Sequence, residues 1–265
     1  MYSFDYTRPT TIAEAVSAIG SSTEARFLAG GQTLVPTLKQ RLARPGKLVD
    51  LAGLKDLRGV EQSGNAIGIG AMTTHAEVAA SAVILKAIPA LAKLAAGIGD
   101  PMVRHRGTIG GSIANNDPAS DYPAGVLGLG ATLVTDRRQI KADDFFKGLF
   151  TTALQPGEMI TGIGFPIPEK AAYVKMEQRA SRYALVGVFV AKTAAGVRVA
   201  VTGAGDNGVF RVPEFEAALT ARFAPDAIAG KAVSPAGLMG DIHGSAEYRS
   251  NLISVLTERA VAALV

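Results

Sequence analysis

The chain has 265 residues, of which 48% are hydrophobic and 19% charged, with a formal net charge of +4 and no cysteine. No apolar run approaches the roughly 20 residues that span a bilayer, and the first residues show no basic region followed by an apolar stretch. We therefore expect no transmembrane segment, no signal peptide and a cytoplasmic location. The absence of cysteine excludes disulfides and thiolate-held iron–sulfur clusters in this chain, and no cluster of Lys and Arg is dense enough to predict a nucleic-acid partner.

Residues 1–57 have the pattern of a small α/β unit. Residues 10–20 start with a threonine cap, place apolar residues at helical spacing and stop at a glycine, which predicts a helix. A short strand at 25–29, a helix at 34–42 and a second strand at 48–51 follow. Helices and strands therefore alternate through this unit.

Residues 58–168 are the second predicted unit, of mixed helices and strands. Apolar residues alternate at 66–71, an alanine-rich helical run extends from 74 to 94, and a strand is predicted at 131–135. Two prolines at 163–168 predict a linker that ends the unit.

Residues 169–265 are the third predicted unit. Strands are predicted from 172, at 185–191 and at 197–201, and a helix is predicted at 246–264. The hairpin-like spacing favours an antiparallel sheet packed on helices, so the predicted fold class of the whole chain is α+β.

Two glycine-bearing stretches carry the functional prediction, FLAGGQTL at 27–34 and TIGGSIANNDPASD at 108–121. Glycines let backbone amides approach a ligand without hindrance, and hydroxyl or amide side chains lie beside them, which suits the two phosphates of a dinucleotide such as FAD. The first stretch follows a strand and opens a helix, so its amides and the helix dipole point to one place. We predict that the fold brings the two stretches together as one cradle.

Other chemistry has less support in the sequence. The string GAGDNG at 203–208 matches a dinucleotide fingerprint formally, but the extended, proline-stopped segment behind it opens no helix, so we interpret it as a turn between strands. His75, His105 and His243 share no metal-ligand spacing, and no serine lies in a nucleophile elbow. We expect no metal site and no catalytic residue of its own in this chain.

The two stretches resemble the FAD-binding signatures of the flavoprotein, or medium, subunit of molybdenum hydroxylases of the xanthine dehydrogenase and carbon monoxide dehydrogenase type. Residues 6–15, 73–77 and 240–249 are also similar to segments of this family. The resemblance implies a two-part FAD-binding domain, with subdomains at 1–57 and 58–168, followed by a C-terminal flavoprotein domain at 169–265.

The resemblance also implies the site. Residues 29–33 and 108–112 would wrap the pyrophosphate, and Gln32, where many relatives have another residue, can still serve through its backbone. Asn115 and Asp121 would contact the polar chain of the flavin, and the remaining residues would line the cleft. The implied cofactor-binding residues are Leu28, Ala29, Gly30, Gly31, Gln32, Thr33, Leu34, Ile98, Gly99, Val103, Gly107, Thr108, Ile109, Gly110, Gly111, Ser112, Asn115, Asp121, Met159, Ile160, Lys175 and Tyr183.

Two of these residues keep alternative interpretations. The ammonium of Lys175 would stabilise negative charge at the N1 and O2 edge of the reduced flavin, or Lys175 is a surface lysine. The ring of Tyr183 would stack on the isoalloxazine or gate it, or Tyr183 is a packing residue.

By this resemblance, the chain is one subunit of a larger oxidoreductase. A large subunit with the molybdenum cofactor would hydroxylate the substrate, and a small subunit with two-iron two-sulfur clusters would pass electrons to FAD in this chain and on to an external acceptor. A dimer of heterotrimers is the expected assembly. The alternatives are a self-sufficient FAD-dependent reductase on the related fold and a nonenzymatic nucleotide-binding module, and the substrate and acceptor stay open.

Overall fold

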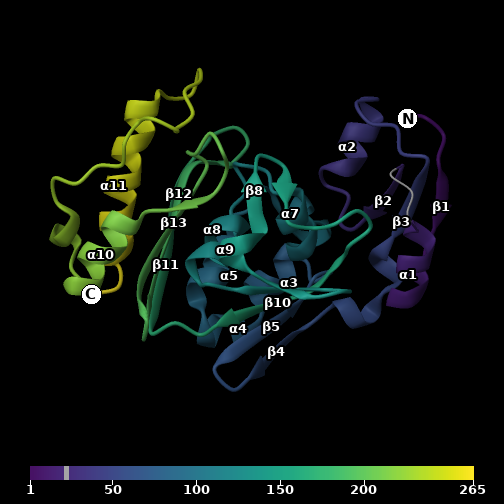
Figure 1. Ribbon diagram of the computed structural model, residues 1–265, viewed down its shortest axis with the longest axis horizontal. Helices are drawn as coiled ribbons and strands as arrows, with labels where there is room; N and C mark the ends of the chain where they lie inside the picture. The colour runs from purple at the N-terminus through teal and green to yellow at the C-terminus, as the bar shows by residue number, and fades with distance from the viewer. Residues whose placement is uncertain (21–23) are drawn as a thin grey trace.

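The computed structural model describes residues 1–20 and 24–265 and contains three main sheets arranged in a row (Figure 1). The N-terminal part lies at one end, the central part in the middle and the C-terminal part at the other end. The mixed α+β class predicted from the sequence is confirmed. Within the described residues, no helix has the length and apolar character needed to cross a membrane.

The N-terminal part is a three-stranded parallel sheet with two helices. Its elements are β1 (Asp5–Thr7), α1 (Ile12–Ile19), β2 (Ala25–Leu28), α2 (Leu34–Lys39) and β3 (Lys47–Asp50), followed by the short 3-10 helices η1 (Leu51–Gly53) and η2 (Lys55–Leu57). The strand order is β1-β3-β2, with both outer strands parallel to β3. Thr11 and Glu14 form a capping box at the start of α1, so the predicted helix begins two residues after Thr10.

The central part combines an antiparallel sheet with a group of short helices. Its elements are β4 (Val60–Ser63), β5 (Ala66–Gly70), α3 (His75–Ala80), α4 (Ala82–Ala87), α5 (Pro89–Ala96), α6 (Pro101–Arg106), α7 (Ile109–Asn115), α8 (Tyr122–Gly128), β6 (Thr132–Thr135), β7 (Gln139–Lys141), α9 (Ala142–Phe145), β8 (Phe146–Gly148), β9 (Thr151–Thr152) and β10 (Ile160–Pro166). The main sheet has the order β4-β5-β10-β6-β7, and β8 pairs with β9 separately.

Two sequence predictions for the central part are wrong. The single helical run at 74–94 is three helices, because Ser81 caps α4 and Pro89 opens α5. The predicted linker at 163–168 is mostly strand β10, which pairs with β5 and β6 in the middle of the sheet. Pro166 is the last residue of that strand, so its missing N–H interrupts no hydrogen bond in the interior of the sheet.

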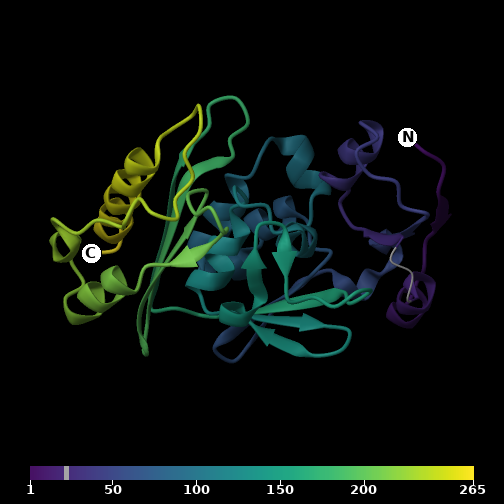
Figure 2. The same cartoon turned by 45° about the horizontal axis from the view of Figure 1, so that its top comes forward.

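The C-terminal part is a four-stranded antiparallel sheet covered by helices, as predicted. Its elements are β11 (Lys170–Glu177), β12 (Ala184–Thr193), β13 (Gly196–Thr202), β14 (Phe210–Arg211), α10 (Pro213–Ala221), the 3-10 helix η3 (Pro225–Ile228) and α11 (Ala246–Ala262). Figure 2 shows the yellow helix α11 and the green helix α10 on the outer side of this sheet. The segment at 203–208 is the turn between β13 and β14, as predicted.

Strand β12 is buried on both faces and joins the central and C-terminal parts. Val188 and Val190 belong to the core under α10 and α11, whereas Phe189 belongs to the core of the central part. Phe189 packs against α8 at Gly128, where a Cβ would lie 2.9 Å from the ring. The glycine therefore lets the helix approach the sheet.

Replacing Gly128 with alanine tests this packing. The added methyl group meets a fully buried ring, so we expect the free energy of unfolding to fall by about 1–3 kcal/mol despite the better helix propensity of alanine. The matched control is Gly164→Ala in β10, where the nearest heavy atom to the new Cβ is 3.9 Å away and the change stays within about 0.5 kcal/mol. Equal values for both variants in denaturant unfolding would contradict this packing.

Candidate functional site

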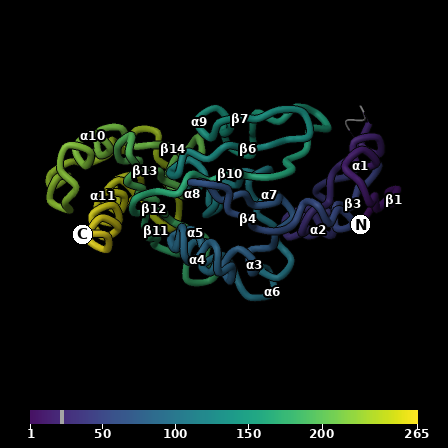
Figure 3. Tube along the Cα trace, turned by 90° about the horizontal axis from the view of Figure 1, so that it is seen from below, coloured from purple at the N-terminus to yellow at the C-terminus, as the bar shows by residue number. Residues whose placement is uncertain are grey.

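A cavity of about 840 Å³ lies where the three parts meet, and both glycine-bearing stretches line it. Figures 1 and 3 show α7 on the side of the central part that faces α2. All predicted site residues except Leu28, Ile109 and Lys175 line the cavity. The lining residues that the sequence reasoning missed are Arg26, Phe27, Leu51, Ala71, Met72, His75, Asp100, Ala114, Asp117, Ser120, Phe150, Leu154, Glu158, Ala180, Ser181 and Arg182.

Glycines bring the first stretch into main-chain contact with Arg106 and Gly107, directly before the second stretch. A Cβ on Gly30 would lie 2.2 Å from the carbonyl oxygen of Arg106 and 2.7 Å from Cα of Gly107, so no side chain fits there. On the other side of the contact, a Cβ on Gly111 would lie 3.3 Å from Cβ of Ala29. The prediction that two stretches about 80 residues apart converge is confirmed.

The first stretch offers free main-chain donors at the start of α2. Among residues 1–20 and 24–265, no protein acceptor bonds the amides of Gly30, Gly31, Gln32, Thr33 or Leu34. Gly31 has a φ of +72°, in the left-handed region that glycine adopts easily. These amides belong to residues that line the cavity, and an N–H without a protein acceptor can donate to an anionic oxygen.

The second stretch differs from its prediction, because the amides of residues 109–112 at the start of α7 already have acceptors in the protein. Ile109 and Gly110 donate to the carbonyls of Thr73 and Ala71 at 3.0 and 2.9 Å, and Gly111 donates to Oγ1 of Thr108 at 3.1 Å. The amide of Ser112 continues the helix by donating to the carbonyl of Thr108. The prediction that both stretches supply free main-chain donors is therefore wrong for residues 109–112 of the second stretch.

The second stretch places the side-chain hydroxyls of Thr108, Ser112 and Ser120 in the lining of the cavity. The hydroxyl of Thr108 accepts from Gly111, so its own hydrogen is available to a ligand. Oγ of Ser112 lies 2.7 Å from Oγ of Ser120, and both residues line the cavity. One stretch thus presents amides and the other presents hydroxyls.

Asp121 lines the cavity but is bonded inside the protein. Its Oδ1 accepts from the hydroxyl of Tyr173 at 2.5 Å and lies 3.0 Å from Nζ of Lys175. Burial raises the pKa of Asp121, while the charge of Lys175 and the Tyr173 hydrogen bond oppose that rise. Lys175 also donates to two backbone carbonyls, so its ammonium is committed to the protein and does not support a role at the flavin edge.

His75 is a buried residue of the cavity wall that the sequence reasoning left without a role. It is the first residue of α3, its Nε2 lies 2.5 Å from where Gly107 would carry a Cβ, and its Nδ1 is buried without a hydrogen-bond partner among the described residues. Burial and then the charge of Arg104 lower the pKa of His75 to about 4, so the imidazole is neutral at pH 7. No pattern in the sequence marks this placement, because it depends on the bridge between Thr74 and Thr108.

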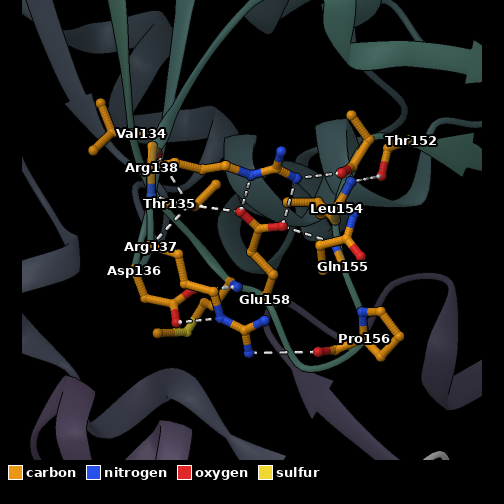
Figure 4. A network of polar contacts seen from close by, with 12 residues as sticks. Val134, Thr135, Asp136, Arg137, Arg138, Thr152, Leu154, Gln155, Pro156 and Glu158 are labelled. Atoms are coloured by element: carbon orange, nitrogen blue, oxygen red, sulfur yellow. Dashed lines mark hydrogen bonds and ion pairs between the residues drawn. The ribbon is translucent and has the colours of Figure 1, made fainter.

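Glu158 is the centre of a polar network with Thr135, Arg138 and Gln155 (Figure 4), and it directly precedes Met159 and Ile160, which line the cavity. Its Oε1 accepts from Thr135 and Arg138 at 2.8 and 2.9 Å, and its Oε2 accepts from Arg138 and the amide of Gln155 at 2.9 and 2.7 Å. Hydrogen bonds from Arg138 lower the pKa of Glu158 from 4.5 to about 2, supported by Gln155 and Thr135 and opposed by burial.

Met159 and Ile160 join two hydrophobic cores at this segment. Met159 packs in the core of the N-terminal part, whereas Ile160 packs in the core of the central part. Asp136 bonds the backbone of Met159 on both sides, accepting its amide at 2.7 Å and donating to its carbonyl at 3.0 Å. The polar network therefore sets where the two parts meet beside the cavity.

A cavity of this size, lined by free amides at a helix start and by hydroxyls, defines a binding site for a phosphate-bearing cofactor. The model of the family described as the FAD binding domain in molybdopterin dehydrogenase matches residues 2–168. The chain belongs to this family and is the FAD-binding component of a molybdenum-dependent oxidoreductase.

Known proteins match over nearly the full length of the chain. The carbon monoxide dehydrogenase medium chain of Afipia carboxidovorans is 36% identical, over 98% of this chain and 96% of that protein. The nicotine 6-hydroxylase medium subunit of Paenarthrobacter nicotinovorans is 35% identical, over 97% and 95%. The solved structure of reconstituted CO dehydrogenase from Oligotropha carboxidovorans has a TM-score of 0.89 at 34% identity, over 98% of this chain and 97% of that chain.

Glu158→Gln tests the polar network through its dependence on pH. The folded-state pKa lies below the usual value, so the ionised carboxylate stabilises the fold fully above about pH 4.5 and this contribution is lost as the pH falls towards about 2. At pH 7 we expect the variant to lose roughly 2 kcal/mol of unfolding free energy, allowing for solvent around the half-exposed Arg138. The difference from the original chain should narrow below pH 4.5 in unfolding titrations.

The matched control is Glu169→Gln, which removes a carboxylate from an exposed pair with Lys192. Surface pairs contribute little, so this variant should stay within about 0.5 kcal/mol at every pH. A difference between Glu158→Gln and the original chain that does not change between pH 7 and pH 3 would show that the charge of Glu158 is not what stabilises the segment.

Proposed function

We propose that this chain binds FAD in the cavity and passes electrons from iron–sulfur clusters of a partner subunit through the flavin to an external acceptor. The observation that carries the proposal is the contact of the two glycine-bearing stretches around one cavity inside the family-matched region. The isoalloxazine ring supplies the redox chemistry when bound, because it accepts and releases electrons one or two at a time. The chain supplies binding, orientation and shielding from water.

The residues divide these tasks by their chemistry. The amides of residues 30–34 would hold the diphosphate, and the hydroxyls of Thr108 and Ser112 would complete its hydrogen bonds. Asn115 stays a proposed partner of the polar chain, and Ile98, Val103, Met159 and Ile160 supply apolar wall. Tyr183, a half-exposed lining residue from the C-terminal part, is the proposed aromatic neighbour of the ring system.

The absence of cysteine supports a division of labour between subunits, because clusters held by thiolates must lie in another chain. We propose a large subunit with the molybdenum cofactor, a small subunit with two-iron two-sulfur clusters, a dimer of heterotrimers and a cytoplasmic location. Residues 1–57, 58–168 and 169–265 are the proposed domains. Relatives of equal similarity are named for carbon monoxide and for nicotine, so the substrate is a property of the partner subunit.

Gly111→Ala tests the cradle without separating the two stretches. The added Cβ lies 2.9 Å from Oγ1 of Thr108 and 3.3 Å from Cβ of Ala29, between the groups assigned to the diphosphate. We expect a protein of similar melting temperature whose FAD dissociation constant rises by about tenfold or more, since one or more charge-assisted hydrogen bonds are lost. Flavin content after gel filtration and a fluorescence titration measure the change.

Gly30→Ala is the informative comparison, because its Cβ meets the main chain of Arg106 and forces the two stretches apart. This variant should lose stability and FAD together, whereas Gly164→Ala should lose neither. Full flavin content in Gly111→Ala would contradict the assignment of the diphosphate to this gap.

The subunit proposal is tested on the complex that copurifies with the tagged chain. We expect molybdenum, iron and acid-labile sulfide in the complex and FAD as the only redox group assigned to this chain, because the chain has no thiolate for a cluster. Photoreduction of the clusters should be followed by bleaching of the flavin. A chain that turns over a substrate alone, with no molybdenum in its copurifying fraction, would instead support the self-sufficient reductase.

A further inference from the structure

Lys175 is bonded to three separate regions of the protein at once. Its Nζ donates to the carbonyl of Gly97 at 2.9 Å and to the carbonyl of Arg182 at 2.9 Å, and it lies 3.0 Å from Oδ1 of Asp121. The side chain is only 9% exposed. An ammonium has three N–H donors, so each donor has one acceptor within the protein.

The three acceptors connect the cavity wall to the C-terminal part. Gly97 ends α5, and Asp121 precedes α8 in the central part. Arg182 belongs to the turn between β11 and β12, which we name the 178–183 hairpin. Residues 180–183 are the described residues through which the C-terminal part lines the cavity.

The 178–183 hairpin has a conformation that needs external support. Gln178 donates to the carbonyl of Tyr183 at 2.9 Å, and Arg182 donates to the carbonyl of Gln178 at 2.8 Å. Arg182 has a φ of +60°, an unfavourable conformation for a residue with a side chain. Such a residue persists where its surroundings hold it, and here Lys175 holds its carbonyl while its guanidinium lies 3.5 Å from the carbonyl of Gly99.

We propose that Lys175 is a positioning residue that clamps the 178–183 hairpin over the cavity and thereby places Tyr183 at the cofactor. Its pairing with Asp121 gives the clamp a buried anchor, which Tyr173 completes from the same strand. The ammonium acts through the hairpin and not by contact with the flavin. This inference rests on the proposed binding of FAD in the cavity.

The test compares Lys175→Met with two controls in the complex purified with its partner chains. Lys170→Met removes an exposed lysine of the same strand β11, whose ammonium donates to the carbonyl of Leu264, and Lys175→Arg keeps a cation. The chain has no tryptophan, so quenching of flavin fluorescence by this chain reports on its tyrosines. The readouts are the fluorescence lifetime of bound FAD and its dissociation rate.

We expect Lys175→Met to lengthen the flavin lifetime and to raise the dissociation rate of FAD by up to about tenfold, because the displaced hairpin no longer holds the ring of Tyr183 against the flavin. Lys170→Met should change neither the lifetime nor the dissociation rate, and Lys175→Arg should change both less than Lys175→Met does. In a background of Tyr183→Leu, Lys175→Met should add no further change in lifetime, because the clamp acts through Tyr183.

Two results would overturn the clamp. One is an unchanged lifetime and dissociation rate in Lys175→Met, and the other is a change of equal size with and without Tyr183. If Lys175→Met does not fold because Asp121 is left unpaired, Lys175→Met with Asp121→Asn removes both charges and tests the same hairpin. A wild-type complex without FAD would refute the proposed function itself, which separates that failure from failure of the clamp.

Discussion

The contact between the main chains of Gly30 and Gly107 is the constraint on which the site depends. The backbones approach so closely that a single Cβ at Gly30 would overlap the carbonyl of Arg106. This contact fixes the distance between the amides at the start of α2 and the hydroxyls at the start of α7. Met159 and Ile160 fix the same two parts from the other side, because consecutive residues pack in different cores.

The two carboxylates buried deepest in the cavity wall, among the described residues, are each neutralised by a neighbouring cation. Asp121 is paired with Lys175, and Glu158 is paired with Arg138. An unpaired carboxylate buried as deeply as these two would repel an anionic ligand, and burial would raise its pKa. The neutral imidazole of His75 adds no charge, so in the proposed function the attraction for phosphate would come from dipoles of the amides at the start of α2.

The sequence predicts the features that neighbouring residues determine. It does not predict hydrogen bonds whose partners lie far away along the chain. The caps of α1, the antiparallel C-terminal sheet and the convergence of the glycine stretches follow from spacing and resemblance. The loss of the free amides of Ile109 and Gly110 does not follow in this way, because their acceptors, Thr73 and Ala71, lie 36 and 39 residues earlier. Lys175 is similar, since its acceptor Gly97 is 78 residues away and no local pattern distinguishes a buried clamp from a surface lysine.

The C-terminal part touches the cavity through one hairpin, and the physical reason lies in how its sheet is packed. Strand β12 is buried on both faces. Its Phe189 packs into the core of the central part, and its opposite face packs against α11, so the sheet is a firm support for the hairpin. The hairpin at its end is exposed, holds a residue at positive φ, and is fixed at its base by Lys175. The side chains of Tyr173 and Lys175, both on β11, contact Asp121 in the cavity wall. A change in packing between the C-terminal and central parts would therefore move β11 and, with it, Asp121 and the shape of the proposed FAD site.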